Sequence, residues 1–332
     1  MFSMDMIMRK LRFGLIGCGD ISKKRVAPAL RDLPNVDFVA VNRANYEIAE
    51  SFAREFGAKK WYKTWQELIS DDEIDAVYIA TPVYLHCPQT IAAAESGKHV
   101  LCEKPMAMTI EECDKMISVC KVNNVKLGIA YYRHFYPAIN RTKEIIASGE
   151  IGQVVFVQIN AFEYFNPEPP DRRCWFLKKS QAGGGPMFDF GCHRIEVLLN
   201  ILGPIKFTKG FISKVLFERE VEDTSTAFFK FESDANAVLN ITHSAFEPQD
   251  TIDIFGDKGS IHIPILNAGD ITIKTENITR TEKHPPHPNL HQPLIDDFTN
   301  AVLNNREPVV NGTIGKEVAK IEELIYNDWK FI

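Results

Sequence analysis

Hydrophobic residues in the first third of the chain form short, nearly continuous apolar runs, separated by stretches of mixed polar and apolar residues. Such runs, rich in β-branched residues, are typical of parallel strands buried on both faces. They cover residues 11–17, 36–41, 76–81, 99–103 and 126–131. The mixed stretches predict helices over residues 22–33, 46–57, 88–97 and 110–123. This alternation of strands and helices indicates an α/β domain built on a doubly wound parallel sheet.

The pattern changes after about residue 127, where short strands with polar–apolar alternation become common. A helix, a strand, a loop rich in Pro, Arg and Gly, and a longer helix are expected first, over residues 137–148, 154–162, 166–187 and 188–202. Strands follow over residues 207–217, 225–231, 237–246, 251–256, 260–265 and 270–276. A Pro/His-rich loop and two closing helices complete the chain, over residues 284–293, 292–304 and 312–329. We therefore predict two domains: a dinucleotide-binding domain over residues 1–127 and an α+β domain with a largely antiparallel sheet over residues 128–332.

Composition narrows the class of protein. The 332 residues are 45% hydrophobic and carry 38 basic and 44 acidic side chains, a net charge of −6. Disorder is thereby excluded for most of the chain, and no charge excess favours nucleic acid or an anionic membrane as a partner. No apolar run approaches the roughly 18 residues of a transmembrane helix, and the first residues do not resemble a signal peptide. Seven cysteines without a CxxC pair indicate reduced thiols in the cytoplasm, not disulfides or a zinc site.

A glycine-containing turn, GCGDIS, joins the first predicted strand to the first helix at residues 17–22. Gly17 suits the tight turn, and Gly19 lets the backbone approach a pyrophosphate. Asp20 and Ile21 open the helix, whose free N–H groups attract phosphate, and Ser22 replaces the third glycine of the usual pattern. At this position in the chain, the turn predicts a dinucleotide-binding loop.

The end of the second predicted strand carries information about the cofactor. An Asp or Glu there would bind the ribose 2′-hydroxyl of NAD, but the chain has Asn42 and Arg43. The guanidinium of Arg43 is suited to pair with the 2′-phosphate of NADP. We therefore favour NADP, while NAD stays open because an arginine at a strand end is also a common surface residue.

Two further segments end strands at the edge where doubly wound sheets bind ligands. Thr81 and Pro82 end the third predicted strand, and His86 follows them. His86 either lies near the bound ligand or is a histidine that caps or packs a helix. Glu103 and Lys104 follow the fourth strand in the sequence Glu-Lys-Pro. The ammonium of Lys104 would donate a hydrogen bond near a nicotinamide and stabilise an oxyanion.

The segment GGGPMFDFGCH (183–193) has the richest chemistry of the chain. Asp189 and His193 are four residues apart, which puts both on one face of a helix. A neutral histidine beside a carboxylate is a candidate general base near pH 7, although the pair could also be a surface pair without function. No HExxH motif or cysteine cluster accompanies them, so we expect no metal site.

Other polar residues give weaker indications of a metal or substrate site. His284, His287 and His291 match no standard set of metal ligands, so we expect their loop to be solvent-exposed or at the rim of a substrate site. Arg133, Arg173 and Trp175 are candidates to line a sugar site, with arginine suited to a carboxylate or phosphate on the substrate.

Taken together, these segments resemble the glucose–fructose oxidoreductase/inositol dehydrogenase/rhizopine catabolism (Gfo/Idh/MocA) family. The resemblance spans roughly residues 11 to 327. Its matching stretches are LRFGLIGCGDIS, DAVYIATPVYLHCPQTIAAAESGKHVLCEKPMAMT, YYRHFYPAINRTKEIIASGEIG, AGGGPMFDFGCHRIEVLLNILG, IFGDKGSIHI and NLHQPLIDDFTNAVLNNREPVVNG. The EKP segment together with the GGG…D…G.H segment is far more specific than the glycine turn alone.

The resemblance implies a Rossmann domain joined to a domain with a large open, mostly antiparallel sheet. Family members commonly associate through that sheet, so a homodimer or homotetramer is expected. The family's catalytic positions correspond to Lys104, Asp189 and His193, and its cofactor-side positions to Gly17, Gly19, Thr81, His86 and Glu103. The acid that usually follows the second strand is missing, which puts NAD in doubt.

We therefore expect an NAD(P)-dependent oxidoreductase acting on a secondary alcohol or ketone of a sugar, polyol or cyclitol. His193 would take the hydroxyl proton, Lys104 would hydrogen-bond the same oxygen, and Asp189 would hold the substrate or orient His193. Lys104 is equally compatible with donating the proton in the reductive direction. The alternatives are a reductase of a dicarbonyl or anhydro sugar that uses NADPH, a dihydrodiol dehydrogenase, and a sensor that binds the cofactor without turnover.

Overall fold

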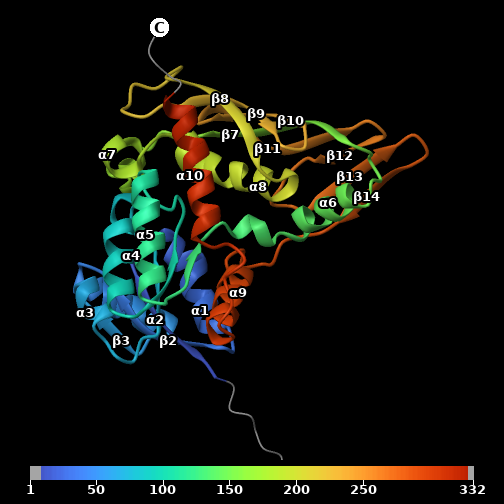
Figure 1. Ribbon diagram of the computed structural model, residues 1–332. Helices are drawn as coiled ribbons and strands as arrows, with labels where there is room; N and C mark the ends of the chain where they lie inside the picture. Colours follow the sequence, from blue (N-terminus) through green and yellow to red (C-terminus); the bar gives the residue numbers. More distant parts are fainter. Residues whose placement is uncertain (1–8, 328–332) are drawn as a thin grey trace, which may run out of the picture. The chain divides into compact units, whose positions relative to one another are not determined.

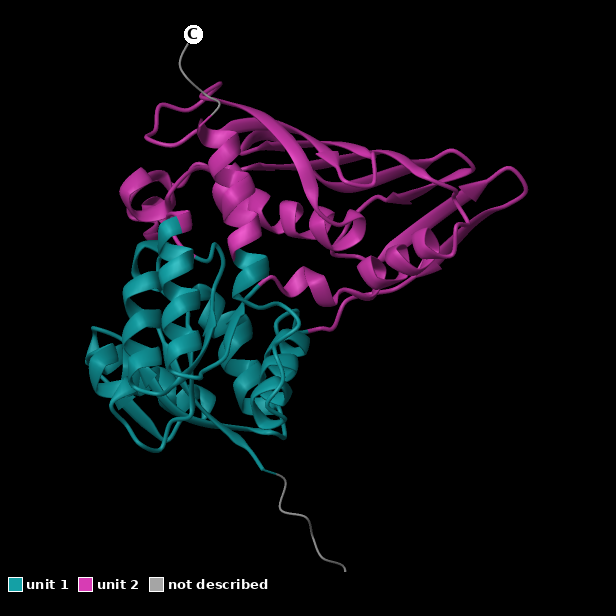
Figure 2. Ribbon diagram, viewed as in Figure 1, with its two compact units in different colours: residues 1–106, 111–130, 289–315 teal, residues 107–110, 131–288, 316–332 magenta. Residues whose placement is uncertain are grey.

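The structure, a computed structural model, describes residues 9–327 (Figure 1). Residues 1–8, on which the expectation of no signal peptide rests, lie outside this range. Residues 328–332, which include the end of the last predicted helix, also lie outside it. The chain divides into two compact units (Figure 2). Among the described residues, unit 1 comprises 9–106, 111–130 and 289–315, and unit 2 comprises 107–110, 131–288 and 316–327.

Unit 1 contains a six-stranded parallel sheet in the order β3-β2-β1-β4-β5-β6. Its strands are β1 (Leu11–Ile16), β2 (Val36–Asn42), β3 (Lys60–Tyr62), β4 (Ala76–Ile79), β5 (His99–Cys102) and β6 (Leu127–Ile129). The side chains of β1 and β4 are almost all buried, as the continuous apolar runs predicted. The expected doubly wound parallel sheet is therefore confirmed.

Helices connect these strands and cover the sheet. They are η1 (Ser22–Val26), α1 (Ala27–Asp32), α2 (Tyr46–Phe56), α3 (Trp65–Ile69), η2 (Val83–Leu85), α4 (His86–Glu95) and α5 (Ile110–Val122). Local sequence sets their ends: the Asn45 side chain accepts a hydrogen bond from Ile48 N at the start of α2, and Gly57 ends it at φ 80°. The hydrophobic pattern does not predict β3 and α3, because elements of three and five residues are too short to display a period.

Unit 1 also includes α9 (Gln292–Leu303), although the expected boundary gave this segment to the second domain. The ring of Phe298 lies 6.1 Å from the ring of Phe13 in β1, centroid to centroid. A Cβ on Gly128 in β6 would lie 2.7 Å from Phe298 Cδ2, so this glycine is needed for α9 to pack so closely. The unit is therefore assembled from segments that are distant in sequence.

Unit 2 contains an eight-stranded sheet in the order β14-β13-β12-β11-β7-β10-β9-β8. Its strands are β7 (Val154–Tyr164), β8 (Ile205–Ser213), β9 (Thr224–Phe231), β10 (Asn236–Thr242), β11 (Ser244–Gly256), β12 (Gly259–Ile263), β13 (Asp270–Thr275) and β14 (Thr279–Lys283). All pairings are antiparallel except the one between β10 and β7. The expected large, mostly antiparallel sheet is confirmed, and β11 extends further toward its N-terminus than the pattern indicated.

The helices α6 (Pro137–Ala147), α8 (Cys192–Leu202) and α10 (Gly312–Asn327) lie along one face of this sheet (Figure 1), and the first residues of α10, up to Gly315, belong to unit 1. The shorter helices of unit 2 are η3 (Tyr132–Phe135), η4 (Arg172–Leu177), α7 (Lys179–Ala182) and η5 (Met187–Gly191). Residues of β8 alternate between this face and the opposite one: a Cβ on Gly210 would lie 2.5 Å from Ile325 of α10, whereas Phe211 is 55% exposed. The sheet thus has one covered and one open face.

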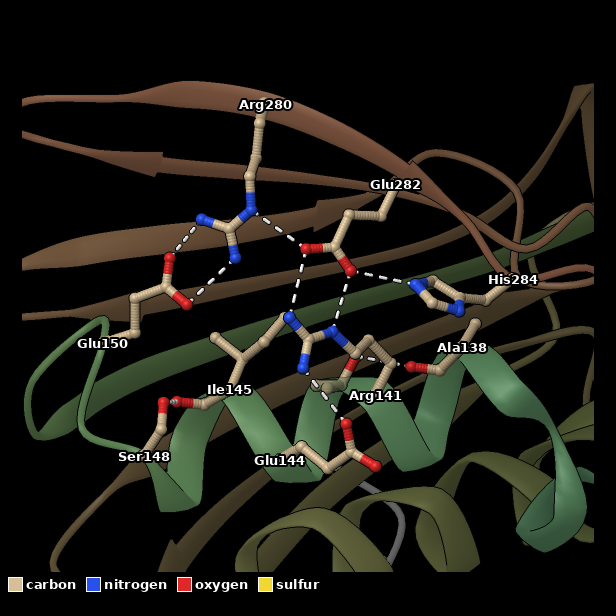
Figure 3. Close-up of polar contacts among 10 residues, drawn as sticks. Ala138, Arg141, Glu144, Ile145, Ser148, Glu150, Arg280, Glu282 and His284 are labelled. Carbon is tan, nitrogen blue, oxygen red and sulfur yellow. Dashed lines mark hydrogen bonds and ion pairs between the residues drawn. The ribbon is translucent and has the colours of Figure 1, made fainter.

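An ion-pair network joins α6 to the edge strand β14 (Figure 3). The carboxylate of Glu282 accepts hydrogen bonds from Arg141 Nε at 2.8 Å, from Arg280 Nε at 2.9 Å and from His284 Nε2 at 2.9 Å. Arg280 also pairs with Glu150. The hydrogen bond from Arg141 is the main reason that the pKa of Glu282 lies far below its usual range. Because every member is partly exposed, each pair contributes only about 0.2–1 kcal/mol to stability.

None of the helices in residues 9–327 combines the length and the apolar character needed to cross a membrane.

Candidate active site

The glycine turn has the geometry of a phosphate-binding loop. Gly17 has φ +100°, and a Cβ there would lie 2.6 Å from the carbonyl oxygen of Ala80, so only glycine fits. At Gly19, by contrast, no heavy atom lies within 4 Å of the position that a Cβ would take. The hydroxyl of Ser22 donates to the Gly17 carbonyl at 2.6 Å and closes the turn. Open space over Gly19 at a helix start suits a pyrophosphate, so these residues fit a dinucleotide.

Arg43 extends from the end of β2 to the glycine turn, where its guanidinium donates to the Cys18 carbonyl. The side-chain amide of Asn42 turns the other way and donates to the Tyr62 carbonyl at 3.2 Å. Asp20 is exposed at the helix start and Ile21 is partly exposed. The structure thus brings Arg43 to the turn, while Asn42 is a buried residue that holds β2 against β3.

His86 begins α4 and connects two loops at the carboxyl edge of the sheet. Its Nε2 lies 2.8 Å from the Thr81 carbonyl and its Nδ1 lies 2.9 Å from the Pro105 carbonyl. Burial lowers the pKa of His86, although both carbonyls favour the protonated form. Thr81 in turn donates from Oγ1 to Gln89 at 2.7 Å. His86 is therefore placed to fix the loop with Thr81 and Pro82 against the loop with Lys104.

Glu103 is a buried carboxylate next to Lys104. Its Oε1 accepts from the Tyr78 hydroxyl at 2.8 Å and lies 3.2 Å from His291 Nε2, and its Oε2 lies 3.3 Å from the Lys104 amide nitrogen. Burial alone would raise the pKa of Glu103, but His291, Lys104 and Tyr78 outweigh burial and lower it. An ionised Glu103 thus holds the backbone of Lys104, whose side chain is partly exposed. The Lys104–Pro105 peptide bond is cis.

Asp189 and His193 lie at the junction of η5, a π-helix, with α8. The spacing predicts both on one face of a helix; in the structure Asp189 lies in the wider π-helical turn, a form that recurs at functional sites, and His193 lies in the α-helix that follows. His193 is 3% exposed and packs edge-on against Tyr132 at 4.8 Å and Tyr131 at 5.8 Å between ring centroids. Packing on two rings fixes the orientation of the imidazole.

Arg133 is buried in η3, with its guanidinium 4.9 Å from the centre of the Tyr132 ring. Within the described residues its Nε and Nη1 have no hydrogen-bond partner. Because both atoms are inaccessible, Arg133 supports the Tyr132 ring that contacts His193 instead of presenting its charge to solvent.

Arg173 and Trp175 lie together in η4, within the loop expected to vary with substrate. Arg173 pairs with Asp171 at 2.7 Å and lies 5.3 Å from the centre of the Phe165 ring. Trp175 stacks on Phe176 with the ring centroids 3.8 Å apart. The charge of Arg173 is thus compensated within its own loop, whereas the partly exposed Trp175 offers an aromatic surface.

The candidate residues are divided between the two units: Lys104 belongs to unit 1, and Asp189 and His193 belong to unit 2 (Figure 2). No sequence motif points to Tyr78 or Glu222, and the sequence predicts His291 only as part of an exposed loop or of a loop at the rim of a substrate site. The structure buries His291 completely. These residues contact partners far away in sequence, so a motif could not have identified them.

Two family models match the chain. Residues 11–131 match an oxidoreductase family with an NAD-binding Rossmann fold, and residues 139–262 match the GFO/IDH/MocA C-terminal domain. The chain belongs to the GFO/IDH/MocA oxidoreductase family. The expected resemblance is therefore confirmed over both domains.

Relatives within the GFO/IDH/MocA family include enzymes of sugar chemistry. The chain is 28% identical to the 1,5-anhydro-D-fructose reductase of Ensifer adhaerens over 92% of each chain. It is 31% identical to the NADP-dependent D-xylose 1-dehydrogenase of Haloarcula marismortui, over 92% of this chain and 87% of that one. A levoglucosan dehydrogenase solved with NADH and levoglucosan superposes with a TM-score of 0.88 at 25% identity, over 96% and 97% of the two chains.

Within residues 9–327, no group of three or more His, Cys, Asp or Glu side chains is arranged to hold a metal ion.

Proposed function

We propose that this GFO/IDH/MocA oxidoreductase transfers hydride between a nicotinamide cofactor and a secondary alcohol or ketone of a sugar, polyol or cyclitol. The observation that carries the proposal is the combination of the open glycine turn at Gly17–Gly19 with the anchored Lys104 and the packed His193. Unit 1 would bind the cofactor and unit 2 the substrate. The bound nicotinamide supplies or accepts the hydride.

The chain's own residues would handle the proton. In the oxidative direction His193 takes the hydroxyl proton, while the Lys104 ammonium hydrogen-bonds the same oxygen and stabilises its developing negative charge. Asp189 holds the substrate or orients His193. In the reductive direction Lys104 is equally suited to donate the proton. Glu103 contributes indirectly, because its ionised carboxylate fixes the Lys104 backbone.

Substrate residues beyond this set are part of the same proposal. Trp175 offers an apolar ring face of the kind on which sugar rings stack. Arg173 would shape that loop through Asp171, and Arg133 would act through the Tyr132 ring. Reduction of an anhydro sugar is the second candidate, favoured by the similarity to 1,5-anhydro-D-fructose reductase over nearly the whole chain.

We propose NADP as the preferred cofactor, with NAD as the alternative. Arg43 lies at the glycine turn through its bond to the Cys18 carbonyl, and no acid follows β2. A guanidinium at this position suits a 2′-phosphate. Similar proteins include one named for NADP and one solved with NADH, so the relatives do not decide between them.

We also propose a cytoplasmic homodimer or homotetramer. All seven cysteines are free thiols, which favours a reducing compartment. The open face of the unit 2 sheet exposes Phe207, Phe228 and Phe255 by 60%, 49% and 40%. Such an apolar surface supports association between copies.

Titration with NADPH and NADH, followed by nicotinamide and protein fluorescence, is the first test. We expect the protein to bind one of the two cofactors and then to turn over at least one compound in a panel of sugars, polyols and keto sugars. A protein that binds neither cofactor would contradict the proposed function.

A further inference from the structure

Glu222 is a buried carboxylate that contacts the backbone at the start of η5, the π-helical turn that contains Asp189. It is 5% exposed and comes from the turn that precedes β9. Its Oε2 accepts from Gly185 N at 2.8 Å and its Oε1 from Met187 N at 3.3 Å. The Tyr326 hydroxyl of α10 donates to the same Oε1 at 2.6 Å. One side chain therefore joins three segments that are distant in sequence.

The backbone groups that Glu222 binds belong to the start of η5, where local sequence supplies no cap. Pro186 holds the N-cap position without a side-chain hydrogen bond, and glycines precede it. The first N–H groups of a helix need acceptors, and a carboxylate also suits the positive end of the helix dipole. Glu222, which lies 35–37 residues away in sequence, provides both the acceptor atoms and the negative charge.

The same contacts explain why three glycines stand in a row. A Cβ on Gly184 would lie 2.3 Å from the Tyr326 hydroxyl oxygen, and a Cβ on Gly185 would lie 2.2 Å from the Glu222 carbonyl oxygen. Gly183 has φ +83°, and its Cβ would collide with the Phe188 ring at 2.4 Å. The glycine loop is thus shaped around Glu222 and Tyr326.

The connection from Glu222 to Asp189 is short. The Gly185 carbonyl accepts hydrogen bonds from the amides of Phe188 and Asp189, each at 3.1 Å, while the Gly185 N–H donates to Glu222. Arg219 holds the Glu222 backbone from the other side, with Nη2 donating to the Glu222 carbonyl at 2.6 Å. A shift of the carboxylate therefore moves Gly185, whose carbonyl group fixes the first turn of η5.

We propose that Glu222 is a positioning residue, which with Tyr326 anchors η5 and so sets the orientation of Asp189 and His193 toward substrate. Its carboxylate acts through the backbone, because it is 5% exposed and binds Gly185 N, Met187 N and the Tyr326 hydroxyl. This inference rests on the proposed function, because it assigns Glu222 a role in that chemistry. Misplacement of a catalytic group by about 1 Å can cost on the order of a hundredfold in rate.

Three variants test the proposal in the full-length protein. Glu222→Ala removes the anchor, Glu222→Gln keeps one carbonyl acceptor, and Tyr326→Phe removes a single hydroxyl. Glu220→Ala is the matched control, since Glu220 also accepts from a backbone amide, Lys179 N at 2.9 Å, but is exposed and outside the anchor. We expect kcat to fall at least about tenfold in Glu222→Ala, less in Glu222→Gln and Tyr326→Phe, and to stay within about twofold in the control.

Hydrogen exchange separates positioning from general loss of fold. The amides of residues 185 and 187–191 should exchange faster in Glu222→Ala, while the core amides of β9 and β10 and the Kd for NAD(P)H stay unchanged. Unchanged exchange, or faster exchange with wild-type kcat, would overturn the proposal. If Glu222→Ala does not fold, wild-type kcat in both Glu222→Gln and Tyr326→Phe overturns it. A wild-type protein without turnover contradicts the proposed function instead, and the exchange data still test the anchor.

Discussion

His291 and Glu103 lie 188 positions apart in the chain, and their side chains meet in the interior of unit 1 with Nε2 and Oε1 3.2 Å apart. His291 stands at the start of α9, while Glu103 follows β5. The pair therefore ties a late segment of the chain to the loop that carries Lys104.

Replacing His291 by Gln should lower the stability of the fold near neutral pH and make that stability depend less on pH in acid. Because the folded state lowers the pKa of Glu103, this carboxylate stabilises the fold above its unfolded pKa, about 4.3, and the contribution is lost as the pH falls through the lowered value. We expect a loss of about 1.5–3 kcal/mol at pH 7, which shrinks below about pH 4. Thermal unfolding from pH 3 to 8 measures it. His262→Gln, in the partly exposed pair with Asp253, is the control and should cost less; equal losses would contradict the assignment.

Gly17→Ala and Gly19→Ala should separate folding from cofactor binding. At Gly17 the positive φ and the Ala80 carbonyl make alanine costly, by about 1–3 kcal/mol, so the midpoint of thermal unfolding should fall. At Gly19 the space is open, so stability should not change, while NAD(P)H binding weakens by at least about tenfold, or about 1.4 kcal/mol. Calorimetry and fluorescence titration measure the two effects. Normal cofactor affinity in Gly19→Ala would show that the pyrophosphate does not approach this turn.

Lys104→Ala and His193→Ala should each lower kcat by about a hundredfold or more, because general acid–base groups typically contribute 10²–10⁴-fold. The Kd for cofactor should stay nearly unchanged. If both groups act on one substrate oxygen, the double variant should lose much less than the product of the two single losses. Steady-state kinetics decide this, with the exposed Lys121→Ala as control. Fully multiplicative losses would mean independent roles.

Arg43→Ala should change cofactor preference. Loss of the guanidinium removes the partner of a 2′-phosphate, so NADPH affinity should fall by about 1.5–3 kcal/mol while NADH affinity stays within about twofold. Arg54→Ala, an exposed arginine on α2, serves as control. Tighter binding of NADH than NADPH by the unaltered protein would contradict the NADP proposal directly.

Phe228→Asp should dissociate the proposed oligomer. Phe228 stands on the open face of the sheet opposite Lys209 and Val238. Asp at this position could pair with Lys209, but it would lose the apolar contact of the ring and add the cost of desolvating charge at an interface. Sedimentation velocity should then shift to the monomer mass of 37.7 kDa. Val122→Asp, on the surface of α5 and 83% exposed, should leave the mass of the complex unchanged. A monomeric wild-type protein would refute the proposal.

Sequence patterns predicted the fold well where one face or both faces of an element are buried over several residues. The continuous runs gave β1, β2, β4 and β5, and the glycine turn was expected at the end of β1. The strand β14 was missed because its residues Thr279–Lys283 alternate between exposed and half-buried polar side chains, which have no apolar period.

Candidate site residues could be predicted from the sequence where they belong to a local motif. They could not be predicted where the site depends on contacts between residues that are distant in sequence. The spacing of Asp189 and His193 identified them as a pair. It could not predict the π-helical turn, because the backbone N–H groups at the start of that turn donate hydrogen bonds to the distant Glu222. In the same way, His291 is buried beside Glu103, which does not lie near it in sequence.

The return of α9 to unit 1 has a consequence for synthesis on the ribosome. Phe298 covers Phe13 and Gly128 of the parallel sheet, yet it is translated about 170 residues after β6. Because the ribosome adds about 5–20 residues per second, roughly ten to thirty-five seconds pass between the synthesis of β6 and that of Phe298. During that interval the apolar surface of the sheet is open to chaperones or to neighbouring chains, so a fragment that stops near residue 130 should be prone to aggregation even though it contains every strand of the sheet.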